Sequence, residues 1–190
     1  MEMSLKRWIA ALIVLVILFL ISCRVCALSP ARPRPLPELP EIKYTDDELN
    51  MIANVVNGEV GGITGTATIT YADGTVVEAD ACLLHQIHAR VVDNQVRHDL
   101  FPDSLRSCVR QYWSKGYSGT SWRTSAQWQH CREDVLLALW GFIEVPDTVL
   151  AATCDPYFAD RYTAYRLWAT VRWDTGWASG TFYYYQYGGD

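Results

Sequence analysis

One glutamate, Glu59, stands in a setting that suits acid–base chemistry. It follows Ile52 by seven residues and Val56 by three, so on a helix it lies at the edge of the buried face. Gly61 and Gly62 would end that helix, which places Glu59 in its last turn. There, partial burial and the negative end of the helix dipole both disfavour the charged carboxylate, and a general acid needs this. The flanking glycines would let a substrate chain approach closely. The alternative is an ordinary surface glutamate near a helix end.

Histidines and cysteines offer weaker chemistry. His85 and His88 are three residues apart and could share a helix face, but no His-Glu-x-x-His motif or comparable third ligand accompanies them. The sequence therefore predicts no metal site and no cofactor. The cysteines lack a C-x-x-C pair, and in an oxidising compartment they could form two disulfides in any of three connectivities. They are Cys82, Cys108, Cys131 and Cys154.

The N-terminus reads as a targeting segment. Lys6 and Arg7 precede an uncharged apolar run, which is typical of a secretory signal or signal anchor. The run is slightly short for a spanning helix, which needs about 20 residues. The sequence before Cys23 resembles a bacterial lipobox, so lipidation of Cys23 is the alternative to an uncleaved anchor. Either way we expect an extracytoplasmic, membrane-anchored protein.

Three segments follow from this pattern. Residues 1–28 are the signal anchor or lipoprotein signal, and residues 29–43 form a proline-rich linker that favours an extended spacer. Residues 44–190 have the size of one domain.

Composition narrows the possible partners. The net charge of −5 argues against binding nucleic acid, because such binding depends on neutralising phosphates. A hydrophobic fraction of 50% argues against a disordered chain. The chain holds 8 Trp and 11 Tyr, and such rings either fill a core or line a carbohydrate cleft.

Local patterns predict a mainly helical α+β domain with a small antiparallel sheet or hairpin. Thr45 would cap the first helix. Alternation around Ala72-Asp73-Gly74 predicts a hairpin within residues 66–79. The remaining expected elements are helices at 80–97, after 101–104 and at 125–141, and a strand at 181–187.

The segment Asn54–Gly62 resembles the "Ala-Arg-x-x-Tyr-Gly-Glu-Ala-Arg-Gly" motif of the SleB/CwlJ-type cell wall hydrolases. Further short similarities follow in the same order, at Ile87–Val91, Phe101–Leu105, Glu133–Gly141 and Phe182–Tyr184. Two departures stand out. Ala89 occupies the place of the family's Asn before Arg90, and the family's "Gln-Phe-Ser" has no clean counterpart.

The resemblance implies a lysozyme-like fold that cleaves peptidoglycan between N-acetylmuramic acid and N-acetylglucosamine, with Glu59 protonating the leaving oxygen. A lytic transglycosylase needs this one acid, whereas a muramidase needs a second carboxylate. The nearest candidates in sequence are Asp73, Glu78 and Asp80, for which a turn or helix-cap role is the alternative.

The expected partners are peptidoglycan glycan strands, and the membrane through the N-terminal segment. We expect the following residues to bind substrate: Arg90, Tyr117, Trp122, Tyr183 and Tyr185. Two other functions stay open. One is a non-enzymatic module that binds the cell wall, and the other is an N-acetylmuramoyl amidase.

Overall fold

The computed structural model describes residues 39–113 and 125–188. Within the chain, Pro40–Asp190 form one compact unit, which is the second of two. The predicted membrane segment and residues 29–38 of the predicted linker lie outside the described residues. Within the described ranges, no helix is long and apolar enough to cross a membrane.

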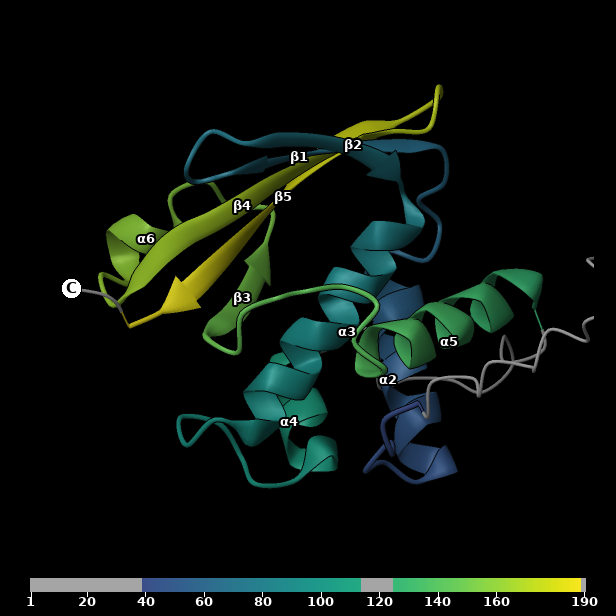
Figure 1. Cartoon of the computed structure of the whole chain (residues 1–190). Helices are drawn as coiled ribbons and strands as arrows, with labels where there is room; N and C mark the ends of the chain where they lie inside the picture. The colour runs from purple at the N-terminus through teal and green to yellow at the C-terminus, as the bar shows by residue number, and fades with distance from the viewer. Residues whose placement is uncertain (1–38, 114–124, 189–190) are drawn as a thin grey trace, which may run out of the picture. The chain divides into compact units, whose positions relative to one another are not determined.

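The second unit is an α+β domain, as predicted (Figure 1). Its described helices are α2 (Asp46–Glu59), α3 (Cys82–Arg97), α4 (Leu105–Tyr112), α5 (Ala126–Leu139) and α6 (Phe158–Arg161). Its described strands are β1 (Thr66–Tyr71), β2 (Val76–Asp80), β3 (Val149–Thr153), β4 (Tyr165–Asp174) and β5 (Ser179–Tyr187).

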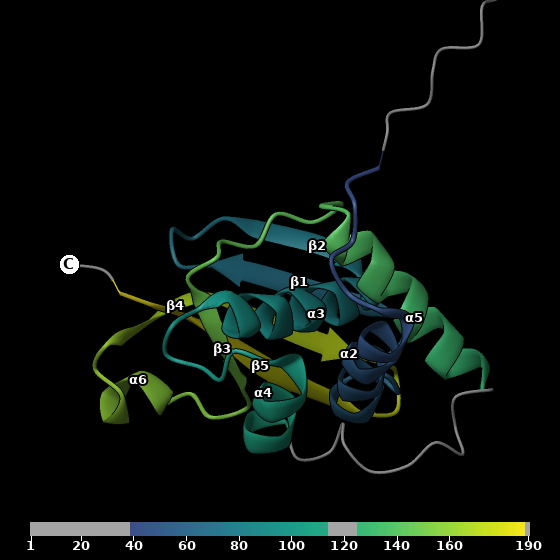
Figure 2. The same cartoon turned by 90° about the horizontal axis from the view of Figure 1, so that it is seen from below.

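The strands form one antiparallel sheet in the order β2-β1-β4-β5-β3. Side chains alternate across it, so Ile69, Val171 and Tyr184 face the core while Thr70 and Arg172 are exposed on the opposite face. Figure 2 looks onto the helical side, with α2, α3 and α4 in front of the strands. The predicted hairpin is β1–β2, but the sheet is larger than predicted because β3 and β4 also belong to it.

Capping side chains start the helices where the sequence predicts. Thr45 caps α2 in a capping box with Glu48, in which each residue satisfies a backbone N–H of the other. Ser104 and Ser125 cap α4 and α5. Each serine hydroxyl accepts from the backbone N–H of the residue three positions later in the chain. Asp80 ends β2, and its carboxylate accepts from the N–H of Cys82 at the start of α3. These bonds fix the ends of the helices that carry the site.

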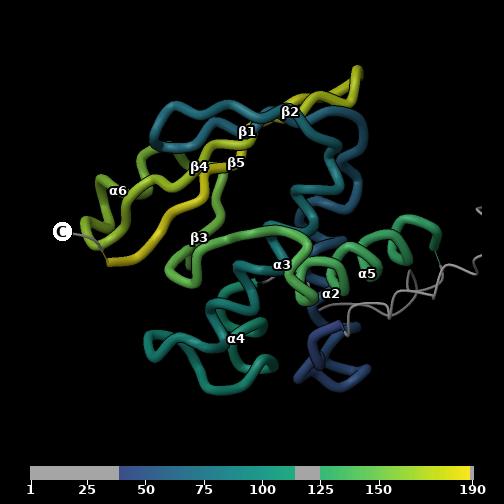
Figure 3. The backbone as a smooth tube through the Cα atoms, in the orientation of Figure 1, coloured from purple at the N-terminus to yellow at the C-terminus, as the bar shows by residue number. Residues whose placement is uncertain are grey.

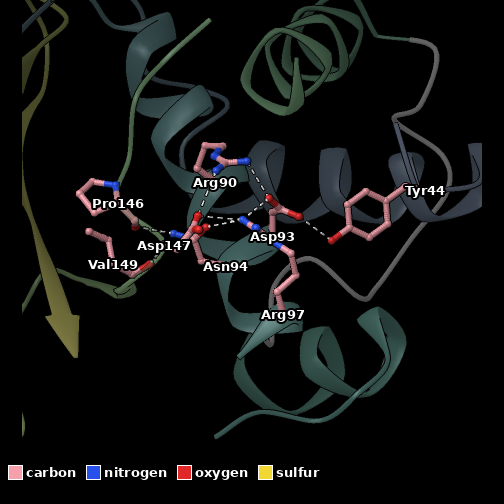
Figure 4. Close-up of polar contacts among 8 residues, drawn as sticks. All are labelled: Tyr44, Arg90, Asp93, Asn94, Arg97, Pro146, Asp147 and Val149. Atoms are coloured by element: carbon pink, nitrogen blue, oxygen red, sulfur yellow. Dashed lines mark hydrogen bonds and ion pairs between the residues drawn. The ribbon is translucent and has the colours of Figure 1, made fainter. Parts of the chain in front are cut away.

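A polar network holds the chain before α2 and the chain before β3 onto α3 (Figure 4). Asp93 accepts from Arg90 and Arg97 at 2.8 and 2.9 Å, and from the hydroxyl of Tyr44 at 2.9 Å. Both arginines also pair with Asp147. Burial, followed by the charge of Asp93, raises the pKa of Tyr44 well above its usual value. The network therefore fixes the register of α3 against two distant segments.

Contrary to the expectation of two disulfides, the structure forms none among the four cysteines of the described chain. Cys108 and Cys131 are fully buried on α4 and α5. Burial raises the pKa of the Cys108 thiol to about 11.

His88 lies on α3 and is buried in the core of the domain, among Trp113, Phe182 and Tyr184. Its Nδ1 lies 3.0 Å from the carbonyl of Leu84 and 2.8 Å from the hydroxyl of Tyr184. Burial lowers the pKa of His88 to about 4. The ring is therefore neutral at pH 7 and serves as a core residue.

This burial predicts a pH-dependent stability. The folded pKa of His88 lies below its unfolded value of 6.5, so stability is complete above that value and falls as the pH drops toward about 4. Going from pH 7 to pH 5 should cost about 2 kcal/mol of unfolding free energy through this ring. Urea unfolding at the two pH values measures the loss. The His88→Gln variant should lose most of this pH dependence, whereas the exposed His130→Gln variant should keep it. An equal loss of unfolding free energy between pH 7 and pH 5 in all three proteins would contradict the prediction.

Candidate functional site

Glu59 is the last residue of α2 and is partly buried. Val60 caps the helix and donates its N–H to the carbonyl of Val56 at 2.9 Å. Glu59 lines two clefts, of about 430 Å³ and about 280 Å³. The predicted helix-end position is thus confirmed.

The larger cleft lies along β3, which is an edge strand of the sheet, and reaches α4, α6 and β4. Gln95 on α3 ties its wall together, because it donates to the carbonyl of Leu150 at 2.6 Å and accepts from the indole of Trp113 at 2.6 Å. Aromatic rings make up half of the lining residues. They are Phe101, Tyr112, Trp113, Phe158, Tyr162 and Tyr165.

The smaller cleft lies between the turn after α2 and the hairpin of β4 and β5, whose tip projects past the neighbouring strands (Figure 3). Trp173 and Phe182 line it from the two strands, and Trp177 lines it from the tip. The side chain of Trp177 is 82% exposed, which is unusual for so large an apolar ring. Aromatic side chains therefore line both of the clefts that Glu59 lines.

The glycines expected to let a substrate approach closely line the smaller cleft, and some glycines near the site also have a packing role. A Cβ on Gly61 would lie 2.6 Å from the Cα of Asn57, so Gly61 lets the turn fold back onto α2. A Cβ on Gly62 would meet nothing within 4 Å. On β5, a Cβ on Gly180 would lie 2.6 Å from the ring of Trp173, so this glycine makes room for the indole beside the cleft.

Among the described residues, Glu59 is the one carboxylate that lines either cleft. The three candidates for a second acid all lie on the β1–β2 hairpin. Asp73 is a turn residue that accepts from the N–H of Thr75 at 2.8 Å. Asp80 caps α3, and Glu78 is exposed on β2.

None of the three predicted substrate-binding residues that the structure describes lines either cleft. Arg90 is held by Asp93 and Asp147 and lines neither cleft. Tyr183 also lines neither, and Tyr185 is buried with its hydroxyl on the carbonyl of Pro156 at 3.0 Å. Tyr117 and Trp122 lie outside the described residues. Trp173 and Trp177, which sequence reasoning missed, stand in the cleft instead.

A second group of reactive side chains was also missed. Cys82 and His85 on α3 meet Asp134 on α5, with one possible ligand atom of each within 4.8 Å of the others. His85 Nδ1 lies 2.7 Å from Asp134 Oδ2, and His85 Nε2 lies 3.2 Å from the carbonyl of Val60. The only signal in the sequence is that Cys82 and His85 are three residues apart, as are Cys131 and Asp134, so each pair shares a helix face.

This group does not have the geometry of a cysteine nucleophile with its base. A base needs a free ring nitrogen toward the thiol, but the two nitrogens of His85 face Asp134 and the Val60 carbonyl.

Comparison with protein-family models, with curated proteins and with solved structures finds no match to this chain. The resemblance to the SleB/CwlJ-type hydrolases therefore stays a prediction, and function has to be argued from the site.

The close contact at Gly180 predicts that a methyl group added there destabilises the protein more than a methyl group added at Gly62. Gly180→Ala should push the Trp173 ring from its place and reduce the unfolding free energy by about 1–3 kcal/mol. Gly62→Ala, at the other wall of the same cleft, should change it by less than about 0.5 kcal/mol because the space is open. Chemical denaturation of both variants measures the difference. Similar losses in both would mean that Gly180 does not make room for the indole.

Proposed function

We propose that this protein cleaves the glycan strands of peptidoglycan, with Glu59 as the general acid. The observation that carries the proposal is the place of Glu59, which is partly buried and lines two clefts rich in aromatic rings. A glycan is a linear polymer of rings with apolar faces, and such faces stack on aromatic side chains. A strand lying through both clefts would present a glycosidic bond to Glu59.

The lining of the clefts favours a mechanism with one acid. Inverting and retaining hydrolases place two carboxyl groups about 5 to 9.5 Å apart across the scissile bond. The described lining offers only Glu59, and the sequence of residues 114–124 contains no Asp or Glu. The reaction that needs a single carboxyl group is that of a lytic transglycosylase.

In this reaction Glu59 donates its proton to the glycosidic oxygen as the bond to the muramyl C1 breaks. The resulting carboxylate then takes the proton of the muramyl C6 hydroxyl, whose oxygen attacks C1. The products are a shortened strand and a 1,6-anhydromuramyl end, and Glu59 recovers its proton. No water enters the balance of this reaction.

Glu59→Gln tests the role of the acid, because the amide keeps the shape and cannot donate an acidic proton. The purified full chain is incubated with peptidoglycan, and released fragments are analysed by mass spectrometry. We expect anhydromuramyl ends from the unchanged protein and a loss of about 100- to 10,000-fold in Glu59→Gln. Glu78→Gln, at an exposed acid of the hairpin, is the matched control and should keep full activity.

Other products would change the conclusion. Reducing muramyl ends would point to a muramidase with a second carboxylate, and release of stem peptides would point to an amidase. Binding to peptidoglycan without any released fragment would leave a wall-binding module, the reading that exposed Trp177 also supports.

The stacking role of Trp177 gives a separate prediction. Trp177→Ala should weaken binding of glycan fragments by about three- to tenfold, with little change in stability because the ring is 82% exposed. Phe142→Ala removes a ring that is 65% exposed and lines neither cleft, so it should leave binding unchanged. Calorimetric titration with soluble fragments measures both. Equal affinities in both variants would exclude Trp177 from the binding surface.

A further inference from the structure

We infer that Cys82, His85 and Asp134 form a binding site for one Zn²⁺ ion. These three residues offer a sulfur, a nitrogen and an oxygen that already lie within 4.8 Å of one another. A tetrahedral zinc ion holds such atoms at about 2.0–2.3 Å from itself, so its ligand atoms stand about 3.3–3.7 Å apart. Small side-chain rotations bring the group to that spacing.

Two helices supply the three ligands. Cys82 and His85 are separated by three residues on α3, so they lie on one helix face, and α3 packs against α5, which carries Asp134. Cys131 precedes Asp134 by three residues on α5, but its buried Sγ lies 3.8 Å from the Oδ1 of Asn57 and is not part of the group.

The placement of His85 suits a metal ligand. Its Nδ1 lies 2.7 Å from Asp134 Oδ2, and its Nε2 lies 3.2 Å from the carbonyl of Val60. With a metal ion bound to Nδ1, Nε2 would carry the hydrogen and donate it to that carbonyl. A metal-bound histidine that donates its other N–H to a backbone carbonyl is the usual arrangement in such sites.

The surroundings of Asp134 also favour a cation. Its Oδ1 accepts from the side chain of Gln86 at 3.4 Å, which leaves Oδ2 directed at His85. Asp80 adds a second negative charge beside Cys82. In the described part of the chain, neither Asp80 nor Asp134 forms an ion pair with Lys or Arg.

The ion would act on the position of Glu59 and would not take part in the reaction. It would hold the start of α3 against α5, and through His85 it would fix the carbonyl of Val60, the residue after Glu59. Zinc binding stands without the proposed catalytic function, because it is measured directly.

The test uses the purified full chain, reduced, stripped of metal by a chelator and then titrated with Zn²⁺. We expect one zinc per chain by elemental analysis, and with Co²⁺ the absorption bands of a tetrahedral thiolate site. Cys82→Ser and Asp134→Asn should each raise the Kd for zinc by at least about 100-fold. The controls are His130→Gln on α5 and Cys154→Ser, and both should bind as the unchanged protein does. Circular dichroism confirms that each variant is folded; Cys82→Ser changes an exposed residue at the start of α3.

Three results would overturn the proposal. The first is a reduced, folded protein that binds no zinc, which would leave the His85–Asp134 contact as an ion pair. The second is zinc binding that Cys82→Ser leaves unchanged. The third is a protein that forms a disulfide between Cys82 and Cys131 and so binds no metal. Mass spectrometry would detect this disulfide as a loss of two hydrogens. We expect Glu59→Gln to bind zinc as tightly as the unchanged protein does. This variant therefore distinguishes a failure of the zinc site from a failure of the proposed catalytic function.

Discussion

The contact between the ring of His85 and the carbonyl of Val60 links the end of α2 to the central helix α3, and the site depends on it. A helix end leaves its last carbonyl groups without partners inside the helix. Here the carbonyl of Val60 accepts from the N–H of Ile63 at 2.9 Å and also lies 3.2 Å from the buried ring of His85, while Gly61 folds back against Asn57 without a clash. The core and the turn after the helix therefore together set the direction in which Glu59 leaves α2. A general acid needs such fixed placement, because a small displacement from the reacting oxygen costs rate.

Features of the fold that depend on local interactions could be predicted from the sequence. The caps at Thr45, Ser104 and Ser125 and the turn at Asp73 depend on bonds within a few residues, so their patterns are visible in the chain. Strands β3 and β4 were missed for physical reasons. β3 reads Val-Leu-Ala-Ala-Thr, which does not alternate, and β4 has a bulge between Leu167 and Ala169 that shifts its pairing with β5.

The site was predicted only as far as its residues lie close in sequence. Glu59 could be found because the helix, its apolar face and the glycines after it are neighbours. Trp173 and Trp177 reach the same cleft from the β4–β5 hairpin, and only the folded sheet brings them there. The same holds for Cys82 and Asp134, which belong to different helices. Tyr185 shows the opposite error, since its ring is buried and its hydroxyl bonds the chain before α6. A tyrosine-rich strand does not reveal which rings face a cleft.

The charges around Glu59 bear on how one carboxyl group could act twice. Along the described walls of both clefts, no Lys or Arg and no second acid stands beside Glu59. Aromatic rings and small residues are prominent in these walls. Few fixed charges would therefore compete with charge that develops on a bound substrate. If Glu59 acts as we propose, protonation of the leaving oxygen and later removal of the hydroxyl proton would both be governed by the substrate.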